Sequence, residues 1–250
     1  MRIIAITNQK GGTGKTTTTV NLGAALALLK KKVLIIDLDP QANATTHLGI
    51  KDIKRSTYNL LLDSDTEGII QNSEIFGLDI VPSKITLARA EIELTSIMGR
   101  ESVLRRKLNK IINDYNYILI DCPPSLGILT INALTTAREV FIPIQAEFFA
   151  LDGVEQLVET ISSVKDQMNP GLGITGVTLT MFDVRNNICK DVLSKVKEIF
   201  TGKVNKTVIR KNVKLAEAPS RGKPVILYDP NCFGSEDYKK LAEEVFRKER

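Results

Sequence analysis

Apolar residues are grouped along the chain in two ways. Short runs with few internal polar residues are typical of strands buried on both faces of a parallel sheet. Between these runs, apolar residues recur at every third or fourth position, which predicts helices. The alternation of the two predicts an α/β fold, a doubly wound, mainly parallel sheet flanked by helices. The predicted strands are residues 3–6, 32–39, 78–82, Tyr117–Asp121, 139–144 and 176–183.

The predicted helices differ in length and in the width of their apolar faces. The stretch 151–168 has the longest regular stripe, which we assign to core packing rather than to a groove for a partner. A last helix is predicted to dock its apolar face on the sheet. The helices cover residues 20–29, 85–94, 102–112 and 151–168, and the last one carries Tyr238, Leu241, Ala242, Val245 and Phe246 on one face.

The composition is that of an ordinary globular protein. The chain has 250 residues, 43% of them hydrophobic and 25% charged, and we expect one domain over residues 1–250. No apolar run approaches the roughly 20 residues of a membrane span, and the N-terminus lacks a signal-peptide layout. Cys122, Cys189 and Cys232 form no CxxC pair, which argues against a disulfide framework or a metal cluster. We therefore expect a cytoplasmic protein.

The positive charge is concentrated in one segment. The net charge is +5, but the segment from Arg185 to Lys223 holds eleven Lys and Arg residues against three acidic ones. The rest of the chain is slightly acidic. A solvated face is the usual explanation of such a segment, yet this asymmetry also suits a surface that contacts the phosphates of nucleic acid.

A glycine-rich loop joins the first predicted strand to the first helix. A strand, a glycine turn and a helix N-terminus form an anion site, because backbone N–H groups and the helix dipole both favour negative charge there. Glycines let the backbone approach phosphate oxygens closely. Lys15 would reach the β- and γ-phosphates of a nucleotide, and the Thr16 hydroxyl would complete a magnesium shell. The loop comprises Lys10, Gly11, Gly12, Thr13, Gly14, Lys15, Thr16 and Thr17.

This loop departs from the strict P-loop pattern at one position. Gln9 stands where the pattern requires glycine, and a second lysine, Lys10, opens the loop. The loop resembles the deviant Walker A box of the ParA/MinD ATPases. The resemblance implies ATP and Mg²⁺ as cofactors and a homodimer that forms on ATP binding. It also implies that Lys10 contacts the phosphates bound by the other subunit, with Lys10, Lys15 and Asp39 as the catalytic residues.

Acidic residues end two of the predicted strands, where open α/β sheets place their ligands. In the family, Asp-x-Asp-Pro-Gln is the first switch, so Asp39 is implied to orient the attacking water and Asp37 to support the magnesium shell. Asp121 matches the Walker B acid that holds a magnesium-bound water, and residues 122–125 resemble the second switch. Resemblance also places Met181 and Asn212 near the adenine.

Two departures from the expected chemistry stand out. The family often reads Ile-Pro-Arg-Asn-Val where this chain has Ile-Arg-Lys-Asn-Val at residues 209–213. Arg210 therefore stands in place of the proline. His47 is the only histidine in the chain and has no identifiable partner in the sequence. We interpret His47 as a residue without a role in the site.

The resemblance extends over nearly the whole chain and favours one branch of the family. Residues 216–220 and 222–224 are similar to a run typical of chromosomal ParA proteins, also called Soj. A MinD-type membrane helix, the cysteines of iron–sulfur carriers and the helix-turn-helix domain of plasmid ParA repressors are not found here. The implied protein is a nucleoid-associated ATPase that binds duplex DNA non-specifically, is stimulated by a ParB-like centromere-binding partner and does not bind membranes.

The basic segment supplies the candidate DNA contacts. It has no interleaved aromatic residues that would stack on single strands, so we expect contacts with the phosphates of duplex DNA. The alternative function is that of an ATP-gated protein that positions a non-DNA cargo, with a basic segment that is merely solvated. The candidates are Arg185, Arg210, Lys211, Lys214, Arg221 and Lys223.

Overall fold

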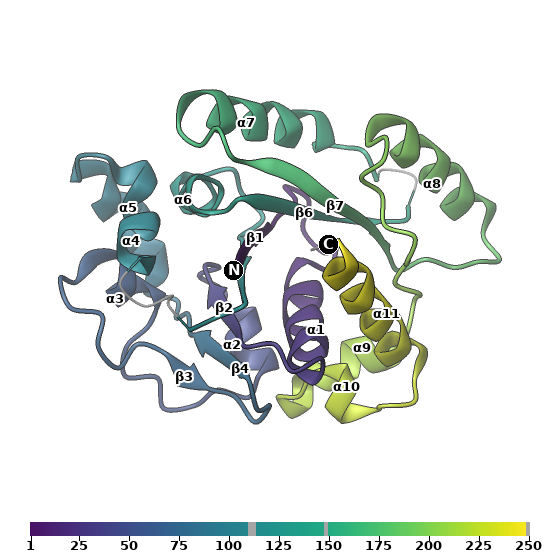
Figure 1. Ribbon diagram of the computed structural model, residues 1–250, viewed down its shortest axis with the longest axis horizontal. Coiled ribbons are helices and arrows are strands. Elements are labelled where there is room, and N and C mark those ends of the chain that lie inside the picture. The colour runs from purple at the N-terminus through teal and green to yellow at the C-terminus, as the bar shows by residue number, and fades with distance from the viewer. Residues whose placement is uncertain (110–113, 148–149, 249–250) are drawn as a thin grey trace.

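One sheet forms the centre of the computed structural model, which describes residues 1–109, 114–147 and 150–248 (Figure 1). Within these residues the sheet has seven strands in the order β3-β4-β2-β5-β1-β6-β7. All neighbours are parallel except β3, which pairs with β4 in the antiparallel sense. The doubly wound, mainly parallel sheet is thus confirmed. Its strands are β1 (Arg2–Ile6), β2 (Val33–Asp37), β3 (Gln71–Asn72), β4 (Leu78–Val81), β5 (Tyr117–Asp121), β6 (Glu139–Gln145) and β7 (Gly173–Thr180).

Helices cover both faces of the sheet, as Figure 1 shows for α6 and α7 on one side and α1 and α11 on the other. Three short 3₁₀ turns, η1 (Leu94–Ser96), η2 (Arg100–Ser102) and η3 (Ala218–Arg221), adjoin them. The helices are α1 (Lys15–Leu28), α2 (Asn43–His47), α3 (Thr57–Leu62), α4 (Leu87–Glu93), α5 (Val103–Leu108), α6 (Ile128–Thr136), α7 (Val154–Gln167), α8 (Asn187–Ile199), α9 (Val213–Glu217), α10 (Val225–Tyr228) and α11 (Phe233–Arg247).

The period of two along each strand divides the core into two layers. On β1, Ile3 and Ala5 face the cluster formed with α3 to α8, whereas Ile4 and Ile6 face the cluster formed with α1, α2, α10 and α11. Both sets are buried. Each buried aliphatic side chain contributes about 1.5–3 kcal/mol through removal of apolar surface from water. Because both faces are covered, the strands other than the edge strand β3 are largely apolar, as the sequence pattern indicated.

Several element boundaries differ from those expected from the sequence. The first helix begins at Lys15 rather than at residue 20, because its first turn consists of threonines that carry no apolar periodicity. The strand predicted over 32–39 ends at Asp37, and the one predicted over 176–183 runs from Gly173 to Thr180. The helix predicted over 102–112 spans Val103–Leu108, and residues 110–112 of that prediction lie outside the described residues.

The edge strand β3 was not predicted at all. It consists of two polar residues, Gln71 and Asn72, and forms only by pairing with Ile80 and Asp79 of β4. Such a strand has no hydrophobic alternation of its own to detect.

In the parts of the chain that the structure describes, no helix has both the length and the apolar character needed to cross a membrane.

Candidate active site

The loop between β1 and α1 is held in place by hydrogen bonds to two other strands, β6 and β7. Asn8 donates its side-chain amide to the Pro143 carbonyl of β6 at 2.8 Å, and the Thr180 hydroxyl of β7 donates to the Thr13 carbonyl at 2.8 Å. Gly12 and Gly14 have φ angles of 75° and 85°, a left-handed conformation that residues with a Cβ rarely adopt. The loop is therefore shaped before any ligand binds.

Lys15 is the first residue of α1 and is 7% exposed. Its ammonium group donates to the Lys10 carbonyl at 3.0 Å. Burial lowers the pKa of Lys15, while the nearby carboxylates of Asp121 and Asp39 act in the opposite direction. A buried cation at the N-terminus of a 14-residue helix is a favourable place for the phosphates of a nucleotide, because both the charge and the free N–H groups attract an anion.

Asp37 and Asp121 lie opposite each other in register at the ends of β2 and β5, and both are fully buried. Burial raises the pKa of each carboxyl, and the proximity of the two groups raises it further for Asp121. Asp37 accepts hydrogen bonds from the Thr45 N–H at 2.9 Å, the Thr45 hydroxyl at 2.6 Å and the Asp39 N–H at 3.2 Å. Asp37 thus holds the start of α2 beside the end of β2.

Asp121 is less completely bonded than Asp37. Its Oδ1 accepts from the Thr19 hydroxyl at 2.9 Å, whereas its Oδ2 is buried without a hydrogen-bond partner among the described residues. An unpaired buried oxygen is costly unless a donor is supplied. A water bound to magnesium is such a donor, so the residues fit a hydrated magnesium ion at this place.

The described residues contain no cluster of three His, Cys, Asp or Glu side chains that could hold a metal on its own. This agrees with the way proteins bind magnesium beside a nucleotide, through few protein ligands, phosphate oxygens and waters. Thr16, Asp37 and Asp121 stay the predicted residues for a magnesium ion that arrives with its nucleotide.

Asp39 faces a cavity of about 320 Å³ above the glycine-rich loop. Its Oδ1 accepts from the Gln41 N–H at 2.9 Å, and its carbonyl accepts from the Ser83 hydroxyl at 2.7 Å. Lys15, Thr16 and Pro124 line the same cavity. A carboxylate fixed in this way can orient a water molecule next to a bound phosphate.

His47 also lines this cavity, although the sequence interpretation gave it no role. It is the last residue of α2, the short helix that Asp37 anchors. Its ring is half-buried, and burial lowers the pKa of His47 to about 4, so the imidazole is uncharged at neutral pH. The sequence could not show that His47 lines the cavity, because it does so only once α2 packs beside the glycine-rich loop.

Replacement of His47 with glutamine is expected to reduce the sensitivity of the nucleotide-free protein to acid. Because the folded-state pKa lies below the unfolded-state value, the unfolded chain takes up the proton first as the pH falls. The wild type should therefore lose about 1–2 kcal/mol of stability between pH 7 and pH 5 through this group. Urea unfolding at both pH values measures the difference. An equal loss in His47→Gln would contradict this prediction.

A second cavity, of about 330 Å³, adjoins the first and brings Met181 and Asn212 together. Met181 lines both cavities and has a φ of 53°, an unusual conformation for a residue with a side chain. Asn212 accepts from the Lys214 N–H at 2.8 Å and so caps α9. The predicted adenine-side residues thus lie in one pocket next to the predicted phosphate loop.

Arg210, which replaces the proline often found in the family, forms part of the wall of the second cavity. Its N–H donates to Asp237 Oδ2 at 2.9 Å, a bond that proline could not make. Its guanidinium group pairs with Asp237 at 2.6 Å and Glu236 at 2.7 Å and lies 4.2 Å from the centre of the Phe233 ring. The contacts with α11 therefore fix the backbone at Arg210, as a rigid proline would fix it in the family pattern.

The other basic candidates have fewer partners within the chain. The Arg185 side chain is 86% exposed and pairs with Asp183 in its own loop. The Phe182 N–H donates to the Ile209 carbonyl, which brings the Arg185 loop beside the segment that carries Arg210. The remaining four are as follows: Lys214 pairs with Glu217 at 2.9 Å, Lys223 with Glu74 at 3.6 Å, and Lys211 and Arg221 are exposed.

The chain is similar to known proteins over its whole length. A family model described as "AAA domain" matches residues 1–174. The sequence is 53% identical to the sporulation initiation inhibitor protein Soj of Bacillus subtilis (98% of each chain) and 49% identical to the chromosome partitioning protein ParA of Caulobacter vibrioides (100% of this chain, 96% of that protein). A crystal structure described as cobyrinic acid a,c-diamide synthase from Mycobacterium smegmatis, with bound ADP and magnesium, is 35% identical with a TM-score of 0.87 and covers 99% of this chain and 94% of its own.

Proposed function

Because the chain belongs to the Soj/ParA family of partitioning ATPases, we propose that its ATP-bound form is a homodimer that holds duplex DNA without reading the base sequence. Hydrolysis of ATP ends that state and releases the DNA. ATP and magnesium are the cofactors, in agreement with two crystal structures that are 35% identical to this chain and contain ADP or an ATP analogue with magnesium. The adjoining cavities at the ends of β1, β2, β5 and β7 support the proposal, because the glycine-rich loop and Asp39 line one of them and Met181 and Asn212 line the other.

Each part of the site has a defined task in the proposed reaction. The backbone from Gly11 to Thr17 and the ammonium group of Lys15 bind the phosphates. The Thr16 hydroxyl and the carboxylates of Asp37 and Asp121 hold a hydrated magnesium ion, which neutralises charge on the phosphates. Asp39 orients the attacking water, and its bond to the Gln41 N–H fixes the carboxylate for that purpose.

Lys10 is assigned a different role from Lys15. The Lys10 N–H donates to Asn8 at 3.0 Å and the Lys10 carbonyl accepts the Lys15 ammonium group, so the backbone at this position is fixed by its own subunit. We assign the Lys10 side chain to the phosphates bound by the second copy of the chain. Nucleotide would then be required to complete the dimer interface.

The observation that carries the DNA assignment is the continuity between the adenine-side pocket and the basic segment. Lys211 and Asn212 line that pocket, and backbone bonds join the same segment to the loop with Arg185. A base bound in the pocket would therefore order two sets of basic side chains at once. In a dimer the contacts double, and DNA binding strengthens steeply with the number of phosphates contacted.

A ParB-like centromere-binding protein is the proposed partner that stimulates hydrolysis. The nucleoid is the expected location, since the DNA contacts need no particular sequence. The test of the whole proposal is the retention of duplex DNA with ATP and without it. ATP-dependent retention that falls with salt supports partitioning, whereas indifference to DNA supports the positioning of a non-DNA cargo.

Salt titrations should rank the basic residues. Arg185→Ala is expected to lower the slope of log affinity against log salt by about one unit per subunit. The reason is that DNA binding releases about one counterion fewer for each phosphate contact that is lost. Arg210→Ala is the comparison, since its guanidinium group is already paired with Asp237 and Glu236. It should change the slope less and weaken ATP binding more.

The measurement uses ATP and two unrelated duplexes of equal length, and Arg185→Lys keeps the charge as a matched control. Equal slopes for wild type and Arg185→Ala would show that Arg185 does not contact DNA. A strong preference for one duplex would show that bases are read.

A further inference from the structure

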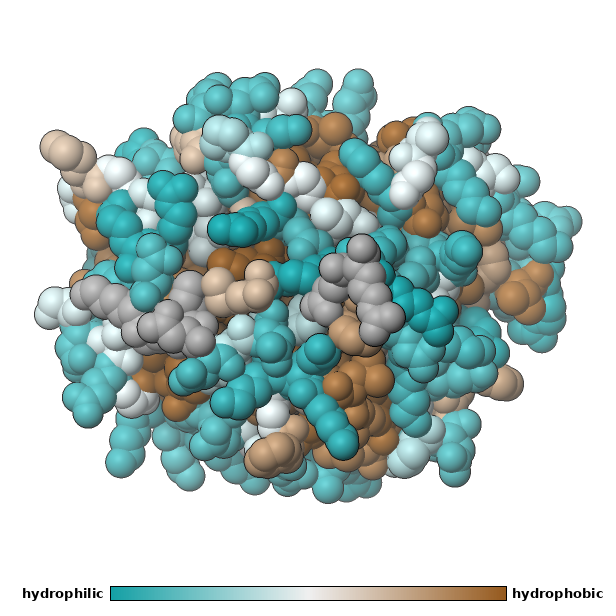
Figure 2. All heavy atoms as spheres, viewed as in Figure 1, coloured by the Kyte–Doolittle hydropathy of each residue, from teal (hydrophilic) through white to brown (hydrophobic). Residues whose placement is uncertain are grey.

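Helix α11 has three faces, and each of them meets a different part of the molecule. Tyr238, Leu241 and Val245 form the buried face, which packs beside α1 in one layer of the core. A second face consists of exposed charged residues, and Figure 2 shows mostly hydrophilic side chains over this part of the surface. The third face lies against residues 206–215, the segment that leads from α8 into α9 (Figure 1).

Glu244 and Gly234 hold the two ends of this segment. The Glu244 carboxylate accepts the N–H of Lys206 at 2.8 Å and the N–H of Thr207 at 3.0 Å. Gly234 packs closely on Leu215, because a Cβ added at residue 234 would lie 2.8 Å from Leu215 Cγ. The two residues of α11 are about three helical turns apart. The helix therefore holds the segment near both of its ends.

Asp237 holds the middle of the segment through Arg210. Its Oδ2 accepts the Arg210 N–H at 2.9 Å, and its carboxylate accepts the guanidinium Nε at 2.9 Å and Nη2 at 2.6 Å. The Asp237 side chain is only 5% exposed, and the Phe233 ring lies 4.2 Å from the guanidinium carbon. Removal of one partner of such a buried charge pair leaves the other charge uncompensated, so the two residues depend on each other.

The segment that Asp237 holds forms one wall of the cavity of about 330 Å³. Residues 209–213 line this cavity in succession. Tyr238, next to Asp237 on α11, lines it as well, and its hydroxyl is hydrogen-bonded to the Thr18 hydroxyl of α1 at 3.1 Å. Helix α11 therefore joins the wall of the adenine-side pocket to the helix that begins at the glycine-rich loop.

The way in which the backbone is fixed at residue 210 is reversed relative to the family pattern. Proline would fix φ through its ring but would offer no N–H to Asp237. Arg210 has no such ring, and its backbone is held from outside by a carboxylate. The glycine-rich loop is held instead by β6 and β7. The contacts of Asp237 therefore bear on the wall beside the base and not on the loop for the phosphates.

We infer that Asp237 is a positioning residue for the purine base of the nucleotide. It holds Arg210, and through Arg210 the pocket wall, in the conformation that receives the base. Because residues 209–213 are ordered before ATP arrives, binding of the base does not cost the entropy of ordering them. This role rests on the proposed placement of the base in the second cavity. Loss of Asp237 should weaken the binding of ATP and leave the binding of phosphates alone unchanged.

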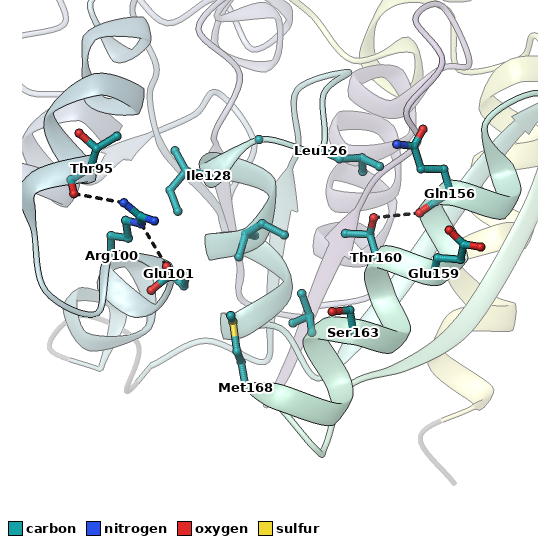
Figure 3. Close-up of a pocket in the computed structure, with 13 residues that line it drawn as sticks. Thr95, Arg100, Glu101, Leu126, Ile128, Gln156, Glu159, Thr160, Ser163 and Met168 are labelled. Atoms are coloured by element: carbon teal, nitrogen blue, oxygen red, sulfur yellow. Dashed lines mark hydrogen bonds and ion pairs between the residues drawn. The ribbon is translucent and has the colours of Figure 1, made fainter.

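The test compares two ligands that share a triphosphate and differ in the base. ATP and tripolyphosphate, each with magnesium, are titrated calorimetrically into the full chain. Asp237→Ala should raise the dissociation constant of ATP at least about tenfold and that of tripolyphosphate by less than about twofold. Glu159→Ala is the matched control, because it removes an exposed carboxylate from α7, in the groove of about 700 Å³ that Figure 3 shows. It should change neither constant.

A second substitution separates positioning from a general effect on folding. Arg210→Pro in the Asp237→Ala background supplies a rigid backbone and leaves no unpaired charge. The double variant should bind ATP within about threefold of wild type. Arg210→Pro alone leaves the Asp237 carboxylate buried and unpaired, so its unfolding midpoint should be lower than that of the double variant. A merely structural role of Asp237 would weaken both ligands together and would give no rescue.

The outcomes decide for or against the role of Asp237. Selective loss of ATP binding with rescue by Arg210→Pro supports it, whereas equal loss for both ligands or absence of rescue overturns it. If Asp237→Ala does not fold, Asp237→Asn keeps an acceptor for the Arg210 N–H and lacks the charge. A selective loss of at least about threefold in that variant supports the role, and unchanged ATP binding overturns it. A wild type that binds ATP no more tightly than tripolyphosphate would contradict the proposed placement of the base itself.

Discussion

Replacement of Lys15 with alanine is expected to lower the affinity for ATP at least about 100-fold, because two charge-assisted hydrogen bonds to phosphate oxygens are lost. Lys15 is the first residue of α1, where the free N–H groups and the helix dipole attract the same anion as its ammonium group. The variant should fold normally, since among the described residues the Lys15 ammonium group donates one hydrogen bond, to the Lys10 carbonyl of the same loop. Titration with a fluorescent ATP analogue and magnesium measures the effect.

Lys10→Ala is the matched control, because it removes the other lysine of the same loop. The isolated subunit should bind ATP with an affinity within a few-fold of wild type, while the ATP-dependent dimer is lost. Sizing chromatography with ATP separates the two effects. A normal dimer from Lys10→Ala would show that the cross-subunit contact is wrongly assigned, and tight ATP binding by Lys15→Ala would show the same for the phosphate contact.

Replacement of Asp39 with alanine is expected to slow hydrolysis about 100-fold or more while ATP binding remains. The glycine-rich loop and Lys15 stay in place in this variant, and only the carboxylate that orients the attacking water is removed. The protein should therefore accumulate in the ATP-bound dimer and remain on DNA. Single-turnover hydrolysis and DNA retention after removal of free ATP are the measurements.

Asp37→Ala distinguishes a catalytic carboxylate from a structural one. Asp37 accepts three hydrogen bonds that position Asp39 and the start of α2, so its loss should lower the free energy of unfolding as well as the rate. Asp39→Ala should leave the unfolding midpoint nearly unchanged. Normal turnover in Asp39→Ala would transfer the catalytic role to another group, with Asp37 as the first candidate.

The nucleotide side of the site could be predicted from local sequence. Glycines at positions 12 and 14 permit a left-handed backbone that other residues rarely adopt, and the structure has positive φ at both. Apolar runs that lead into Asp37, Asp39 and Asp121 predicted acidic strand ends at the ligand side of the sheet, and the structure makes Asp37 and Asp121 register partners. Such features depend on backbone conformation and on hydrophobic period, which neighbouring residues determine.

The partners of single polar side chains came only from tertiary structure. Arg210 binds Asp237, 27 residues away, and Gln9 binds Gln156, 147 residues away. His47 lines the phosphate cavity because Asp37 anchors α2 beside the loop. These contacts arise when separate elements pack on the sheet, and no period or motif in the sequence records which polar groups will then meet. The sequence alone therefore determined the sheet, the phosphate loop and the acidic strand ends. Packing decided the wall of the adenine-side pocket, the surroundings of His47 and the groove beside α7, because each of them is shared by elements distant along the chain.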